Sequence, residues 1–222
     1  MADTPALSRR RLLSLPLVGL PMLGLGVLGL SGPALAARGK VVTILGDSIT
    51  AGLGLPAAEA LPAQLHQALN GLGVANVVRG SGVSGDTTAG GAARMDFSIR
   101  PDTALVVVAL GGNDLLQGID PRVTRGNLDK ILNRLAARHM GVVLAGLKAP
   151  PEIGRGYAHD FDAVFAEAAK AHRVAFFPDL LGGVARNPAL KQADGLHPNA
   201  QGVRLIVGRL APVVAKALAA RP

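Results

Sequence analysis

The sequence predicts an α/β protein with three layers, in which helices cover both faces of a five-stranded parallel sheet. After Lys40, short β-branched apolar runs alternate with longer segments of helical periodicity, which is typical of βαβ units. The 222 residues, 49% of them hydrophobic, suffice for one well-filled domain. No repeat, linker or change of composition interrupts residues 37–222, so we expect these residues to form a single domain.

Five apolar runs are the expected strands. They are Val41–Leu45, Val74–Val78, Thr103–Leu110, Val142–Leu147 and Val174–Phe177. Open parallel sheets bind ligands beyond the carboxyl ends of their strands. We therefore expect the chemistry of this protein in the loops that follow the first, second, third and fifth runs.

Three segments have the apolar spacing of helices that pack on a sheet. Their apolar positions are Leu61, Leu65, Ala68, Leu69 and Leu72; Val123, Leu128, Ile131, Leu132 and Leu135; and Val203, Ile206, Val207, Leu210, Val213 and Val214. Asp120-Pro121 supplies an N-cap and a first-turn proline to the second helix, and the third begins near Pro198-Asn199.

Residues 1–36 have the pattern of an export signal. A basic stretch, Arg9-Arg10-Arg11, precedes an apolar run to about Leu30 and the small-residue site Ala34-Leu35-Ala36. The adjacent arginines followed by leucines resemble a twin-arginine signal, and the alternatives are a general secretory signal or an uncleaved membrane anchor. Each alternative predicts a periplasmic or secreted location for the rest of the chain.

Composition excludes several classes of function. The sequence has no Cys, which rules out disulfides, thiolate catalysis and cysteine metal sites. Residues 37–222 hold 20 basic and 14 acidic side chains, a net charge of +6 that is spread along the chain. With no Trp and one Tyr, stacking platforms for nucleic acid are not expected. This charge is compatible with peripheral contact with an anionic membrane surface.

Four polar motifs follow the expected strands or lie near the C-terminus. They read Gly46-Asp47-Ser48-Ile49-Thr50, Ser81-Gly82-Val83-Ser84-Gly85-Asp86-Thr87-Thr88, Gly111-Gly112-Asn113-Asp114 and Asp194-Gly195-Leu196-His197-Pro198. A lone serine at a strand-to-helix junction is more often a helix cap than a nucleophile. The significance of Ser48 therefore depends on the other three motifs.

In this order, the motifs resemble the GDSL/SGNH hydrolase family over residues 41–215, above all its bacterial multifunctional acyl-thioesterase, lysophospholipase and arylesterase members. The resemblance implies a flavodoxin-like SGNH hydrolase fold and a triad of Ser48, His197 and Asp194. The chemistry is consistent: a neutral imidazole takes the serine proton and returns it to the leaving group. A carboxylate three residues away can fix the tautomer of that imidazole.

The resemblance also implies an oxyanion hole formed by the backbone N–H groups of Ser48 and Gly85 and the side-chain amide of Asn113. Family members commonly have Asn-Ala-Ser-Ile-Ser-Gly-Asp where this chain has Arg79-Gly80-Ser81-Gly82-Val83-Ser84-Gly85-Asp86, so that an Asn is lost and a Gly is added in this loop. The apolar segment Leu115-Leu116-Gln117-Gly118-Ile119 follows the third motif as an expected loop. By resemblance it is a flap in which Leu115, Leu116 and Ile119 bind the acyl chain; the alternative is packing against the next helix.

Other polar residues have simpler explanations. His66, His139, His159 and His172 lie away from the serine motif and are expected to be structural or solvent-facing. Asp47, Asp114 and Asp86 are expected to satisfy loop backbone groups, and no metal or cofactor is expected. Arg79 and Arg94 near the mouth of the site could meet an anionic headgroup or be solvated.

The sequence thus predicts a serine esterase or thioesterase that acts on a small-molecule ester or lipid through an acyl-Ser48 intermediate.

 We expect the protein to be a monomer. One alternative keeps this chemistry but takes an acetylated carbohydrate as substrate, and another is a non-catalytic envelope module that binds lipid. The intact set of Ser48, Gly85, Asn113, Asp194 and His197 favours an enzyme over the binding module. Acyl length, headgroup and leaving group depend on loop conformations and are left open.

Overall fold

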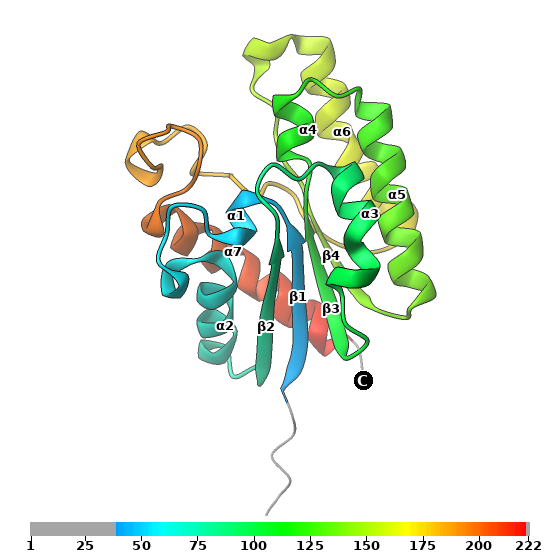
Figure 1. Ribbon diagram of the computed structural model, residues 1–222, viewed down its shortest axis with the longest axis vertical. Helices are drawn as coiled ribbons and strands as arrows, with labels where there is room; N and C mark the ends of the chain where they lie inside the picture. Colours follow the sequence, from blue (N-terminus) through cyan, green and yellow to red (C-terminus); the bar gives the residue numbers. More distant parts are fainter. Residues whose placement is uncertain (1–38, 221–222) are drawn as a thin grey trace, which may run out of the picture. The chain divides into compact units, whose positions relative to one another are not determined.

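The computed structural model describes residues 39–220, which form one sheet with helices on both faces (Figure 1). The strands are β1 (Lys40–Gly46), β2 (Asn76–Gly82), β3 (Thr103–Ala109), β4 (Gly141–Ala145) and β5 (Ala175–Phe177). All neighbouring strands are parallel, in the order β2-β1-β3-β4-β5. The predicted α/β class and the five-stranded parallel sheet are confirmed. The export signal expected in residues 1–36 lies outside the described residues and stays a prediction.

The described part has seven α-helices and three short 3₁₀ helices. The α-helices are α1 (Ser48–Ala51), α2 (Leu61–Gly71), α3 (Thr88–Ser98), α4 (Gly112–Leu116), α5 (Pro121–Ala137), α6 (Arg155–His172) and α7 (Ala200–Ala219). The 3₁₀ helices are η1 (Ala57–Glu59), η2 (Pro151–Ile153) and η3 (Pro188–Leu190). Helices η3 and α7 follow the last strand, and the others lie between strands. None of the helices within residues 39–220 is long and apolar enough to cross a membrane.

The three helices expected from apolar spacing are present as α2, α5 and α7. The side chain of Asp120 caps α5 by accepting from the Arg122 N–H, and that of Asn199 caps α7 by accepting from the Gly202 N–H. Helices α2 and α7 pack together on one face of the sheet, while α5 packs against α3 and α6 on the other (Figure 1). This arrangement gives the three predicted layers.

The core lies between these layers and is almost entirely aliphatic. The middle of β3, from Leu105 to Val108, is fully buried because helices cover both faces of this central strand. The apolar side chains of α7 that meet the sheet, among them Val203, Ile206 and Leu210, are equally inaccessible. Packing of this density makes the sheet a rigid base for the loops at its carboxyl edge.

Two features of the fold differ from the expected elements. The second strand was expected at Val74–Val78 but runs from Asn76 to Gly82, because its residues pair one by one with β1 as far as Gly46. Val74 instead belongs to the turn after α2, where its N–H donates to Leu69 O. Leu115 and Leu116 were expected in a loop but form the last turn of α4.

Candidate active site

Ser48 is the first residue of α1, directly after the carboxyl end of β1. Its neighbour Asp47 caps this short helix, with Oδ1 accepting a 3.0 Å hydrogen bond from the Ile49 N–H. Ser48 is 8% exposed and lines a cavity at the carboxyl edge of the sheet. The nucleophile expected from the sequence is therefore held by a capped turn rather than by a free loop.

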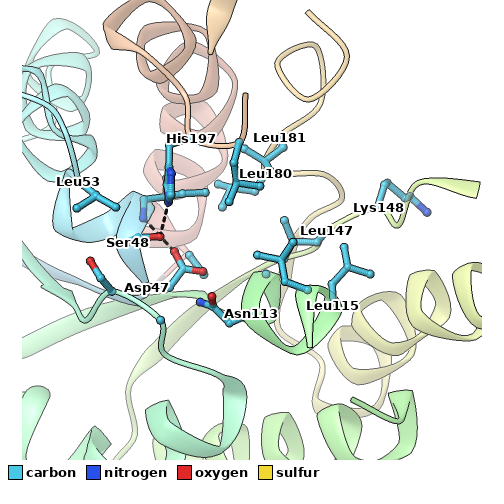
Figure 2. Close-up of a pocket in the computed structure, with 17 residues that line it drawn as sticks. Asp47, Ser48, Leu53, Asn113, Leu115, Leu147, Lys148, Leu180, Leu181 and His197 are labelled. Atoms are coloured by element: carbon cyan, nitrogen blue, oxygen red, sulfur yellow. Dashed lines mark hydrogen bonds between the residues drawn. The ribbon is translucent and has the colours of Figure 1, made fainter. Parts of the chain in front are cut away.

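The side chains of Ser48, His197 and Asp194 form a continuous hydrogen-bonded line. His197 Nε2 lies 2.9 Å from Ser48 Oγ, and His197 Nδ1 lies 2.6 Å from Asp194 Oδ2 (Figure 2 shows the first of these contacts). A proton on Nδ1 that is donated to the carboxylate leaves Nε2 to accept the serine hydroxyl proton. The arrangement is that of a nucleophile, its base and the group that orients the base.

The loop that carries His197 is shaped by the Asp194 carboxylate itself. Asp194 Oδ1 accepts from the backbone N–H groups of Leu196 at 2.9 Å and His197 at 3.0 Å. At the base of the loop, the Gln192 N–H donates to His197 O at 2.8 Å. The turn therefore fixes the imidazole and the carboxylate relative to each other before any substrate binds.

Two further groups expected at the oxyanion hole line the same cavity as Ser48. Gly85 lies in the loop after β2 with φ +83°, a left-handed conformation that glycine adopts without steric cost. Asn113 lies in the first turn of α4, after β3, and its Nδ2 donates to Asp86 O at 2.8 Å. One Nδ2 proton is used in this bond, and the second remains for a ligand in the cavity.

The glycines that distinguish this loop from the common family pattern have close neighbours. A Cβ on Gly82 would lie 2.3 Å from Ala51 N and 2.6 Å from Asp47 O, so the strand end packs directly on the α1 backbone. A Cβ on Gly80 would lie 2.7 Å from the ring of Pro62. The small residues therefore allow β2 to approach α1 and α2 closely at the site.

The cavity beside Ser48 is apolar and has a volume of about 210 Å³. Its walls include side chains that the sequence analysis did not assign to the site: Leu53, Leu147, Lys148, Leu180, Leu181 and Leu196. Figure 2 shows the leucines from the ends of β4 and β5 across the cavity from Leu53. Leu147 and Leu180 each follow the carboxyl end of a strand closely. Because parallel sheets bind ligands beyond these ends, this position in the sequence was the signal that could have found them.

The expected acyl-binding residues are only partly at this cavity. Leu115 and Leu116 line it, Leu115 half-buried and Leu116 61% exposed. Ile119 does not line it, and its backbone carbonyl accepts a 2.8 Å hydrogen bond from Tyr157 on α6. Of the three expected acyl-binding residues, Ile119 is thus the one that does not line this cavity, and its contact with substrate stays a prediction.

Two carboxylates at the site have shifted pKa values of opposite sign. Burial raises the pKa of Asp47 from 3.8 to about 6, although the Ile49 N–H and His197 oppose this rise. The hydrogen bond from His197 lowers the pKa of Asp194 to about 2, with help from the backbone N–H groups of Leu196 and His197. Asp194 is therefore ionised at neutral pH and can stabilise a protonated imidazole.

The remaining acidic residues of the motifs make structural contacts. Asp114 is fully buried and accepts from Thr88 N at 2.8 Å, from Thr88 Oγ1 and from Thr124 Oγ1 at 3.2 Å. It thereby joins α4 to α3 and α5. Within residues 39–220, no group of three or more His, Asp or Glu side chains is arranged to hold a metal ion.

The two arginines expected near the mouth are both paired with carboxylates. Arg79 contacts Asp102 through two hydrogen bonds of 2.6 and 2.8 Å, and Arg94 Nε donates to Asp86 Oδ2 at 2.6 Å. Neither arginine lines the cavity beside Ser48. Arg79 and Arg94 therefore make structural contacts within the protein, and neither is placed to meet a headgroup in this cavity.

The histidines outside the motifs lie away from Ser48. His66 contacts Asn76 and Asn70, His159 contacts its neighbour Asp160, and His172 Nε2 lies 2.7 Å from Asp129. His139 follows α5 and has φ 55°. None of the four lines the cavity.

Known proteins are similar to this chain in sequence and fold. Residues 44–205 match the GDSL-like lipase/acylhydrolase family. Esterase TesA of Pseudomonas aeruginosa is 36% identical over 163 residues, 73% of this chain and 81% of TesA. Thioesterase 1/protease 1/lysophospholipase L1 of Escherichia coli is 35% identical over 165 residues, 74% of this chain and 78% of that protein.

Solved structures extend the likeness to the fold. A crystal structure of TesA matches with a TM-score of 0.76 and 33% identity, and covers 80% of this chain and 99% of that chain. The structure of AlinE4, an SGNH-hydrolase family esterase, matches with a TM-score of 0.68 and 40% identity, and covers 83% and 97%. These findings confirm the resemblance carried by the four motifs. The chain therefore belongs to the GDSL-like lipase/acylhydrolase family.

Proposed function

We propose that this protein hydrolyses carboxylic esters and thioesters through an acyl-enzyme intermediate on Ser48. The observation that carries the proposal is the hydrogen-bonded line from Ser48 through His197 to Asp194 at the wall of an apolar cavity. Relatives named esterase, arylesterase and thioesterase/lysophospholipase support the same reaction class.

The geometry supports a two-step mechanism. As Ser48 Oγ attacks the carbonyl carbon, its proton moves to His197 Nε2, and the carbonyl oxygen becomes an oxyanion. When this intermediate collapses, the bond to the leaving group breaks and the same proton passes to the alcohol or thiol. Water, deprotonated by His197, then attacks the acyl-serine and releases the carboxylic acid and the free serine.

The oxyanion is the group that the surrounding donors would stabilise. The backbone N–H groups of Ser48 and Gly85 and the amide of Asn113 come from α1, the loop after β2 and α4, which meet at the cavity. In enzymes of this kind, loss of one donor costs about 2.7–4 kcal/mol of transition-state stabilisation. Three donors on packed elements therefore supply a large share of the expected rate enhancement.

The cavity favours lipid-derived acyl groups over acetylated sugars. Leucines dominate its walls, whereas a sugar ring requires several convergent polar groups for its hydroxyls. We therefore infer that the substrates are lysophospholipids, aryl esters or acyl thioesters. Hydrolysis of acetylated carbohydrates is the alternative, and the experiment below distinguishes it from the proposed function.

The test uses purified protein and p-nitrophenyl esters from acetate to palmitate, followed by a lysophospholipid and an acyl thioester, with Ser48→Ala as the control. Ser48-dependent turnover that rises from acetate to medium chains supports the proposal. A sharp preference for acetate would favour an acetyl-carbohydrate esterase. If the two proteins hydrolyse every ester equally slowly, the hydrolase proposal is wrong.

We also propose that the protein acts outside the cytoplasm and touches a lipid surface as a monomer. The Arg9-Arg10 motif supports export, and three exposed leucines at the cavity, Leu53, Leu116 and Leu196, support contact with lipid. Replacing both arginines by lysine and following the protein by cell fractionation tests export. Sedimentation with anionic vesicles tests lipid contact, and analytical ultracentrifugation tests the monomer.

A further inference from the structure

Arg94, on α3, uses every donor of its guanidinium group. Nε donates to Asp86 Oδ2 at 2.6 Å, Nη1 to Ser81 Oγ and Ser98 Oγ at 2.9 Å each, and Nη2 to Gly46 O at 2.9 Å and Ser81 O at 3.1 Å. A guanidinium group has five N–H donors, so all of them are satisfied. The side chain therefore reaches from α3 to the ends of β1 and β2, and this complete use of its donors suggests a specific task.

The acceptors of Arg94 lie next to the groups expected to stabilise the oxyanion. Gly46 O belongs to the residue two positions before Ser48, at the end of β1. Asp86 follows Gly85, and its backbone carbonyl accepts from Asn113 Nδ2 at 2.8 Å. A single guanidinium therefore connects, directly or through Asp86, the three segments that carry the three donors.

The pair of Arg94 and Asp86 is partly shielded from water. The Arg94 side chain is 21% exposed and the Asp86 side chain is 11% exposed. Hydrogen bonds between charged groups in such surroundings are shorter and stronger than neutral ones and hold their geometry well. The link between the loop after β2 and the end of β1 is thus more rigid than a solvated ion pair.

Arg94 does not line the cavity beside Ser48, so it has no route to direct contact with the reacting atoms. Any effect on the reaction must pass through the backbone that it holds. Lysine cannot replace it, because an ammonium group has three donors and lacks the planar fork that reaches acceptors on two sides.

Building on the proposed ester hydrolysis, we propose that Arg94 is a positioning residue that sets the geometry of the oxyanion hole. It holds the Gly85 loop, and through Asp86 the Asn113 amide, at a fixed distance from Ser48. Donors displaced by a fraction of an ångström stabilise the oxyanion less while ground-state binding in the leucine-lined cavity is retained. Loss of Arg94 therefore lowers kcat and leaves KM nearly unchanged.

The experiment compares the wild type with Arg94→Lys and Arg94→Gln, using a p-nitrophenyl ester on which the wild type shows Ser48-dependent turnover. Arg79→Gln is the matched control, because Arg79, on β2, also pairs with a carboxylate, but its partner Asp102 precedes β3 at the amino end of that strand, whereas the three donors lie beyond carboxyl ends of strands. Active sites are counted in each sample by titration to completion with a serine-directed phosphonate. This count removes the contribution of unfolded protein from kcat.

We expect both Arg94 variants to lose about 10-fold to 100-fold in kcat per titrated site, with KM within about threefold of the wild type. Binding of an alkyl boronic acid, which forms a charged tetrahedral adduct on the serine, should weaken in parallel. The Arg79→Gln protein should match the wild type in all three measurements.

An Arg94 variant with wild-type kcat per titrated site overturns the positioning role, because Arg94 then affects only the folded fraction. The positioning role is also overturned if Arg79→Gln changes kcat and KM by the same factors as the Arg94 variants do. Should neither Arg94 variant fold, Asp86→Asn, which removes the charge pair and keeps a side chain of the same size, must give the kcat loss. Failure of the proposed function is distinguishable, since the wild type would then lack Ser48-dependent turnover.

Discussion

The side-chain amide of Asn113 donates to the backbone carbonyl of Asp86 across 2.8 Å, which joins the start of α4 to the loop that holds Gly85. The amide is therefore oriented by the protein before substrate arrives. Pre-oriented donors are effective in catalysis because they need not reorganise as the oxyanion forms. The bond also holds the start of α4 and the Gly85 loop together.

Replacing Asn113 by alanine removes both the oxyanion donor and this link. We expect kcat to fall by about 10²-fold or more with a modest change in KM, because the lost interaction forms mainly in the transition state. Steady-state kinetics on a p-nitrophenyl ester measure both constants. Gln117→Ala, an exposed amide at the end of the same helix, is the control. An unchanged kcat would remove Asn113 from the oxyanion hole.

The buried carboxylate of Asp47 makes a prediction about stability and pH. Because its pKa rises from 3.8 in the unfolded chain to about 6 in the folded protein, the folded state binds the proton more tightly. The free energy of unfolding therefore falls as pH rises from about 4 to 6, and above that range the ionised carboxylate costs about 3 kcal/mol.

Asp47→Asn should remove this cost and keep the oxygen that accepts from the Ile49 N–H. We expect the variant to be more stable than the wild type at pH 8 by an amount of that order, and to differ little from it at pH 4. Urea unfolding at the two pH values measures the difference. Asp102→Asn, at an exposed carboxylate whose pKa is lowered by Arg79, should show no such gain. Equal effects of Asp47→Asn at both pH values would contradict the prediction.

The leucine wall of the cavity predicts how acyl length is recognised. Leu115 is half-buried and lines the cavity, so Leu115→Ala removes apolar contact from an acyl chain that reaches it. At about 0.8 kcal/mol per buried methylene, loss of contact with about two methylenes of an octanoyl ester should lower its kcat/KM about tenfold. An acetyl ester, too short to reach this wall, should be hydrolysed as before.

The control for this substitution is Val123→Ala, at a 53% exposed position on α5 that does not line the cavity. Its kcat/KM should be unchanged for both esters. If Leu115→Ala lowers turnover of acetyl and octanoyl esters by the same factor, Leu115 supports the site as a whole and does not bind the acyl chain.

The fold was largely predictable because the sheet has the strongest pattern in the sequence. Runs of β-branched residues that alternate with amphipathic segments allow few architectures other than a parallel sheet covered on both faces. Helix α3 was not expected, since Gly90 and Gly91 weaken its helical propensity and its apolar spacing is poor. The shift of β2 depends on pairing with β1, which no local propensity encodes.

The site was predictable where it follows strand ends and not where it depends on loop shape. The motifs with Ser48 and His197 are read directly from the sequence, and the structure brings these side chains within 2.9 Å. The cavity walls from Leu147, Leu180 and Leu181 depend on how the loops after β4 and β5 turn. The hydrogen bonds of Arg94 depend likewise on the packing of α3 against two strand ends.

Gln192 provides the last prediction, because it connects the loops of the nucleophile and its base. Its Nε2 donates to Leu53 O at 2.8 Å and to Pro198 O at 3.0 Å. Leu53 follows α1, which begins at Ser48, and Pro198 follows His197. The side chain thus joins the segment that follows Ser48 to the segment that carries His197.

Gln192→Ala should loosen the contact between Ser48 Oγ and His197 Nε2 and lower kcat about tenfold, since proton transfer requires hydrogen-bond contact between the two groups. The rate of reaction with a serine-directed phosphonate, which depends on serine activation, should fall by a similar factor. Gln64→Ala is the matched control, because Gln64 also donates through Nε2 to a backbone carbonyl, Ala58 O of η1 at 2.8 Å, but lies on α2 outside the site. A Gln192 variant that reacts with the phosphonate as fast as the wild type shows that the backbone of the two loops alone fixes the Ser48–His197 contact.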